Sequence, residues 1–99
     1  MFRHIVMWDY KEGFSPEENT KNAKAIKSAL EGLKGIIPEI ADIKVVINEL
    51  GYSTKDILLD ASFRDEAGFL IYKDHPDHKA AGQLTKDFLD GRVALDYID

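Results

Sequence analysis

The sequence predicts an α+β domain with elements in the order βαββαβ, the ferredoxin-like order with one four-stranded antiparallel sheet. Four segments divide into two faces with the period of two that is typical of strands, and at least one face of each is apolar. Helix start and stop signals lie between them, and the second helical region reads as a pair of short helices. No repeat or linker interrupts the 99 residues, so we expect a single domain over residues 1–99.

The first predicted strand, residues 2–8, is largely apolar on both faces. One face carries Phe2, His4, Val6 and Trp8, and the other carries Arg3, Ile5 and Met7. A strand that is apolar on both faces is buried on both, so we expect helices on one side and a partner on the other. His4 is then either a core histidine bonded to a backbone carbonyl or part of a pocket.

The first helix has a strong start signal at Ser15. Ser15 is the expected N-cap, Pro16 occupies the first helical position, and Glu18 completes a capping box. An apolar stripe follows along the helix, and Gly35 is the expected stop. Residues 40–47 and 56–64 alternate again and are predicted to be the second and third strands.

The segment from Tyr72 to His78 places a phenol, two imidazoles and a proline within seven residues. Pro76 disfavours helical backbone at His75, so one helix should end near Asp74 and another should begin at Pro76. His78 falls near the third position of the new helix, where the positive end of the dipole disfavours imidazolium. A histidine that is neutral at pH 7 can act as a base.

The new helix is expected to reach about Leu89 and to stop at Gly91, before a fourth strand over residues 92–98. The sheet face turned away from the helices is then apolar and carries Ile5, Met7, Val46, Leu58, Leu95 and Tyr97. A patch of this kind marks a partner surface, and two such sheets stacked face to face would form a homodimer.

Composition excludes several classes of protein. The net charge is −5 and the lysines are scattered, which argues against nucleic acid and against membrane surfaces as partners. The chain has no cysteine, so thiolate nucleophiles and zinc–thiolate sites are excluded. The longest N-terminal apolar run, residues 5–8, is too short for a signal peptide, and the expected location is cytoplasmic.

A metal site is the other reading of His75 and His78. Two imidazoles three residues apart can chelate on a regular helix, with Asp74 or Asp77 adding an oxygen ligand. Pro76 breaks that regularity and no third nitrogen or sulfur ligand is near, so we predict no metal.

Several short motifs resemble the stress-responsive dimeric α/β barrel (Dabb) family, and together they span almost the whole chain. They are residues 4–8 (HIVMW), 37–40 (IPEI), 56–59 (DILL), 62–63 (SF), 72–78 (YKDHPDH) and 96–97 (DY). The resemblance implies a ferredoxin-like protomer, a homodimer whose two sheets form a barrel, and a pocket between sheet and helices in each subunit.

Members of that family include stress-associated proteins without assigned chemistry and a few cofactor-free enzymes, among them the plant olivetolic acid cyclase. By resemblance, the catalytic residues would be Tyr72, His78 and Asp96. His78 would be the base, Asp96 would orient it, and Tyr72 would donate to a developing enolate. A pocket tyrosine of the cyclase's first helix is replaced here by an aliphatic residue near Ile26.

Three function classes follow. The first is a small-molecule-binding stress-response protein whose pocket takes a small hydrophobic or aromatic ligand. The second is a cofactor-independent lyase, cyclase or isomerase that acts on a polyketide-like substrate through a Tyr/His acid–base pair, and a cofactor-free monooxygenase is a distant third. The expected binding residues are His4, Val6, Trp8, Leu59, Phe69 and His75. In the alternative structural interpretation, Tyr72 is a core residue, His78 caps local backbone, and Asp96 is its salt-bridge partner.

Overall fold

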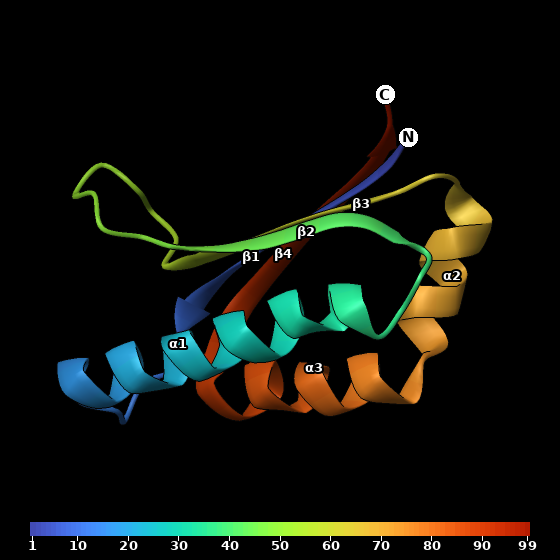
Figure 1. Cartoon of the computed structure of the whole chain (residues 1–99). Helices are drawn as coiled ribbons and strands as arrows, with labels where there is room; N and C mark the ends of the chain where they lie inside the picture. Colours follow the sequence, from blue (N-terminus) through green and yellow to red (C-terminus); the bar gives the residue numbers. More distant parts are fainter.

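The computed structural model describes all 99 residues and has the predicted order of elements (Figure 1). The elements are β1 (Phe2–Tyr10), α1 (Pro16–Glu31), a 3-10 turn η1 (Gly32–Gly35), β2 (Ile40–Ile47), β3 (Ile57–Phe63), α2 (Glu66–Asp74), α3 (Pro76–Phe88) and β4 (Leu89–Ile98). The strands form one sheet in the order β2-β3-β1-β4, and every neighbouring pair is antiparallel. The ferredoxin-like prediction is confirmed.

All the helices lie on one side of the sheet. Figure 1 shows α1 and α3 side by side beneath it, with α2 at one end. The core forms where the apolar stripe of α1, with Ile26 and Leu30, packs on inward residues of β1 and β3 such as Val6 and Leu59. None of the helices combines the length and the hydropathy that crossing a bilayer requires.

The helix boundaries follow the local signals. The Ser15 hydroxyl accepts from the Glu18 backbone N–H at 3.1 Å, and the Glu18 carboxylate accepts from the Ser15 N–H at 2.9 Å. His75 is both the C-cap of α2 and the N-cap of α3, with extended backbone at φ −65° and ψ 133°. The chain therefore turns at His75, as Pro76 predicts, and α3 runs back along the sheet.

The end of α3 differs from the prediction. The helix stops at Phe88, and Gly91 lies inside β4 instead of ending the helix. Its φ of +61° fits a bulge, because the pairing between β1 and β4 shifts between Met7 and Asp9. After Leu89, the residues of β4 are exposed on both faces, because α1 and α3 do not cover this edge strand.

The uncovered sheet face is apolar in the protomer, as predicted. Leu95 is 65 % exposed, Val46 45 % and Tyr97 41 %, and Met7 and Leu58 beside them are half-buried. A surface of this kind is typical of a protein–protein interface.

Candidate functional site

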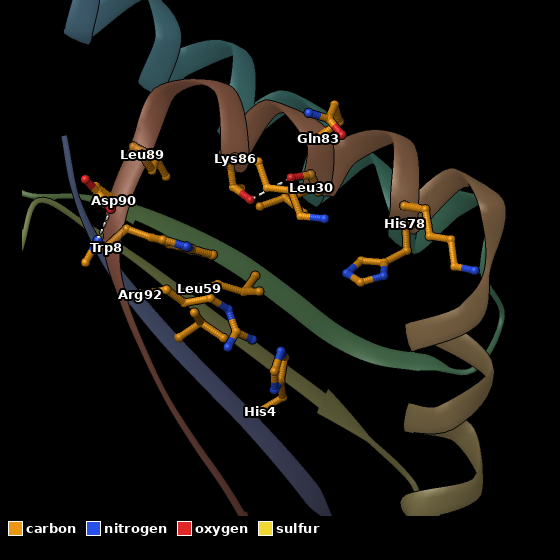
Figure 2. A pocket seen from close by; sticks show the side chains of 15 residues that line it. His4, Trp8, Leu30, Leu59, His78, Gln83, Lys86, Leu89, Asp90 and Arg92 are labelled. Carbon is orange, nitrogen blue, oxygen red and sulfur yellow. Dashed lines mark hydrogen bonds between the residues drawn. The ribbon is translucent and has the colours of Figure 1, made fainter. Parts of the chain in front are cut away.

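A cavity of about 530 Å³ lies between α3 and the sheet, beside the start of β4. Its floor comes from β1 and β3, its roof from α3, and one wall from the start of β4 (Figure 2). Four predicted pocket residues, His4, Val6, Trp8 and Leu59, line it together with His78. The sheet thus supplies an apolar floor, while α3 supplies a titratable group.

His78 extends from the first turn of α3 into the cavity, opposite His4 on β1 (Figure 2). Its Nδ1 lies 3.1 Å from the backbone oxygen of Lys73. A carbonyl oxygen only accepts, so Nδ1 carries the proton and donates it there. The lone pair of a neutral ring is therefore on Nε2.

Burial lowers the pKa of His78 below its usual 6.5, and the nearby charges of His4 and Arg92 lower it further, against the raising effect of the Lys73 hydrogen bond. This direction is the one expected for a neutral imidazole, but its largest cause is burial and not the helix dipole. The Tyr72 ring packs on the imidazole with the ring centroids 4.1 Å apart. His78 is therefore a neutral base held between a backbone carbonyl and an aromatic ring.

Asp96 does not orient His78. Its carboxylate accepts a hydrogen bond from Nδ1 of His4, because His4 on β1 and Asp96 on β4 are directly paired in the sheet. The expected His78–Asp96 pair is wrong, since the Nδ1–H of His78 donates instead to the Lys73 backbone oxygen. His4 is 6 % exposed, so the site contains an oriented His–Asp pair on the sheet, facing a separate histidine on the helix.

Tyr72 lies behind His78 and does not line the cavity. Its side chain has no exposed surface, its hydroxyl has no hydrogen-bond partner, and burial strongly raises its pKa. The hydroxyl therefore stays protonated at any physiological pH. As placed, Tyr72 positions the His78 ring and does not reach a ligand in the cavity.

Phe69 and His75 also lie outside the cavity lining. The Phe69 ring stacks on Phe2 and lies 4.9 Å from the His4 ring, which makes it a core residue that supports His4. His75 uses its Nδ1 to accept from the Asp77 backbone N–H at 3.1 Å. Its ring caps α3, which is a structural role. No three His, Asp or Glu side chains gather closely enough to hold a metal ion.

Sequence reasoning missed the other lining residues. They are Leu30, Lys79, Gly82, Gln83, Thr85, Lys86, Leu89, Asp90, Gly91 and Arg92. A usable signal was present in α3: His78, Gly82 and Thr85 follow at helical spacing of four and three. A stripe of small and polar residues beside an apolar stripe indicates a helix that does not pack fully on its sheet.

The comparisons with known proteins agree with the fold. The model of the family described as "Stress responsive A/B Barrel Domain" (Dabb) matches residues 2–99. None of the curated proteins gives a significant match.

The solved structures similar to this chain include the following three. A dimeric ferredoxin-like protein of unknown function from Bacteroides fragilis is 29% identical, with 97% of this chain and 93% of that chain covered and a TM-score of 0.90. A dimeric ferredoxin-like protein of unknown function from Thermobifida fusca is 30% identical, with 97% and 88% covered and a TM-score of 0.80. Hydroxynitrile lyase from Passiflora edulis is 20% identical, with 99% and 92% covered and a TM-score of 0.76, and this likeness shows the fold alone.

Proposed function

The chain belongs to the stress-responsive A/B barrel (Dabb) family, and from that premise we propose that it binds a small carbonyl compound in the cavity between sheet and helices. The observation that carries the proposal is the unpaired Nε2 of a neutral His78, which faces an open space of about 530 Å³. A space of this size accommodates a small aromatic or polyketide-like molecule. Trp8, Val6 and Leu59 supply its apolar contacts.

The same proposal includes a homodimer through the open sheet face. The similar proteins from Bacteroides fragilis and Thermobifida fusca are described as dimeric. The exposed apolar side chains of Val46, Leu95 and Tyr97 support this face as the contact. Because the cavity lies on the opposite face, each subunit would carry its own site.

A thermal-shift screen of small aromatic and polyketide-like ketones and acids tests ligand binding, with two α3 variants as a matched pair. Gly82 lines the cavity, and a Cβ there would meet nothing within 4 Å, so Gly82→Leu should fill the space without disturbing the backbone. Ala80→Leu places the same side chain at an exposed position of the same helix. A compound present at 100 times its Kd stabilises the folded state by about 2.7 kcal/mol.

We expect such a compound to raise the Tm of the wild-type protein and of Ala80→Leu by several degrees and to leave Gly82→Leu unchanged. If no compound stabilises the wild type, or if all three proteins respond alike, binding in the cavity is refuted.

A second candidate function is cofactor-independent acid–base catalysis, which the two opposed histidines favour. His78 Nε2 would take the proton from the carbon next to a carbonyl. The cationic form of His4, in which Asp96 accepts from Nδ1–H, would donate its Nε2–H to the enolate oxygen. Delivery of that proton from His78 to a different carbon of a conjugated enolate gives isomerisation. If the enolate carbon instead attacks a second carbonyl of the same molecule, the new alkoxide takes that proton and a ring is closed.

Deuterium exchange into the methyl group of acetophenone in D₂O, followed by NMR, tests the proton-transfer step. General base catalysis contributes about 10²–10⁴-fold, so His78→Phe should reduce the protein-dependent exchange rate by that order. Lys24→Gln, at an exposed position of α1 outside the cavity lining, should leave the rate nearly unchanged. Equal rates for the wild type and His78→Phe would reject the catalytic assignment while leaving ligand binding intact.

A further inference from the structure

The charges at the cavity differ from those of the chain as a whole. The net charge is −5, yet the lining contains the cations Lys79, Lys86 and Arg92 and only one carboxylate, Asp90. The Asp90 carboxylate already accepts from the Gly91 backbone N–H at 3.0 Å. The cavity therefore presents an excess of positive charge to whatever enters it.

Arg92 is the lining cation whose charge acts on the candidate base. Its charge acts on both His78 and Tyr72, and Figure 2 shows its side chain extending from β4 toward His4. The guanidinium has no ion-pair partner within the chain, although its planar array of donors suits a carboxylate well. A free guanidinium beside a neutral imidazole is an arrangement that a bound anion would complete.

The bulge in β4 determines which face of the sheet the Arg92 side chain lies on. Asp90 pairs with Asp9 and Val93 pairs with Met7, so two residues, Gly91 and Arg92, lie opposite Trp8. In a regular strand, residues 89 and 92 would point to opposite faces, because their separation is an odd number. The extra residue at the bulge brings both Leu89 and Arg92 to the helix side, where both line the cavity.

The bulge is held in place from outside the cavity. Lys55 Nζ lies 2.8 Å from Asp9 Oδ2 and 3.1 Å from the Gly91 backbone oxygen. A Cβ on Gly91 would lie 2.6 Å from the same Asp9 oxygen. The left-handed backbone at Gly91 is thus required by its surroundings as well as by its φ.

We propose that Arg92 binds a carboxylate of the ligand, so that the cavity takes a small carbonyl acid with its apolar body on Trp8, Val6 and Leu59 and its carbonyl between His4 and His78. This inference rests on the proposed ligand-binding function and specifies its substrate class. Lys86 and Lys79 add positive potential at the rim, which attracts an anion to the mouth. A neutral compound of the same shape would leave the guanidinium without a partner.

The test compares two probes of equal shape, 4-acetylbenzoate and 4-acetylbenzamide, by NMR titration of the protein. We expect the wild type to bind the acid about tenfold more tightly than the amide, since a charge-assisted hydrogen bond is stronger than a neutral one. Arg92→Gln should lose this preference. Arg92→Lys should retain part of it, because it keeps the charge but not the planar donor array.

Arg64→Gln is the matched control, since it removes one exposed positive charge from a residue that does not line the cavity. It should keep the tenfold preference, and the preference should shrink as salt is added. Removing the Arg92 charge should also raise the pKa of His78, a ligand-free readout that a purely structural arginine outside the cavity would not change.

Equal affinity of the wild type for acid and amide, with both lost in Gly82→Leu, overturns the role of Arg92 and leaves the cavity as the binding site. Equal binding of both probes to the wild type and to Gly82→Leu overturns the binding function itself. An unchanged preference in Arg92→Gln refutes the assignment of Arg92 in either case.

Discussion

Replacement of Gly91 by alanine tests whether the β4 bulge is a required feature of the fold. The left-handed conformation at φ +61° costs a residue with a Cβ about 1–2 kcal/mol. The new Cβ would displace the Asp9 carboxylate, and loss of its partly exposed pair with Lys55 adds about 0.5–1 kcal/mol. Alanine also reduces the entropy of the unfolded chain, which offsets about 0.4–1 kcal/mol.

The net expectation is a fall of about 1–2 kcal/mol in the free energy of unfolding, or a Tm lower by about 4–15 °C for a domain of this size. Urea unfolding at one fixed protein concentration measures it, with a lower midpoint and an unchanged slope. Gly82→Ala is the matched control: its site is helical and free of neighbours, so the same exchange should stabilise the protein by about 0.5–1 kcal/mol. Changes of the same sign at both glycines would refute the requirement for a left-handed residue at position 91.

Three further results follow from the same structure. Tyr72→Phe removes a buried hydroxyl that has no partner, so it should leave the free energy of unfolding unchanged or raise it by up to about 1 kcal/mol. A clearly lower free energy of unfolding, measured with urea, would mean that the hydroxyl is hydrogen-bonded. Leu95→Lys on the open sheet face should give a folded monomer in sedimentation velocity experiments. Ile71→Lys, at a comparably exposed position on α2, should remain dimeric. Identical behaviour of the two variants would exclude the sheet face as the contact. Because the pKa of His78 is lowered in the folded state, the unfolded chain binds more protons below pH 6.5. The free energy of unfolding should therefore fall as the pH drops from about 7 to 5. His78→Phe should weaken this dependence, and an unchanged pH profile would contradict the lowered pKa.

The starts of α1 and α3 were predictable because their causes are local. The capping box at Ser15 and the proline at position 76 act within a few residues, and the structure places both helix starts where those signals do. The alternation of β1 and β3 likewise identified the faces of the sheet. These features can be predicted without knowing how the rest of the chain folds.

The partner of Asp96 was not predictable in the same way. Its contact with His4 joins residues 92 positions apart and depends on the register between β1 and β4. That register depends in turn on the bulge at Gly91, which in sequence is equally consistent with a helix stop. The cavity-lining residues of α3 were not predicted for a related reason. They line a cavity only because α3 is separated from the sheet there, and that separation depends on tertiary packing.

The state of the His78 imidazole is the central claim, and long-range ¹H–¹⁵N NMR of the histidine side chains measures it directly over a pH titration. We expect a neutral His78 ring protonated on Nδ1 and a pKa below 6.5, with the Nε2 resonance shifting when a cavity ligand binds. A ring protonated on Nε2, or a pKa above 6.5, would contradict it.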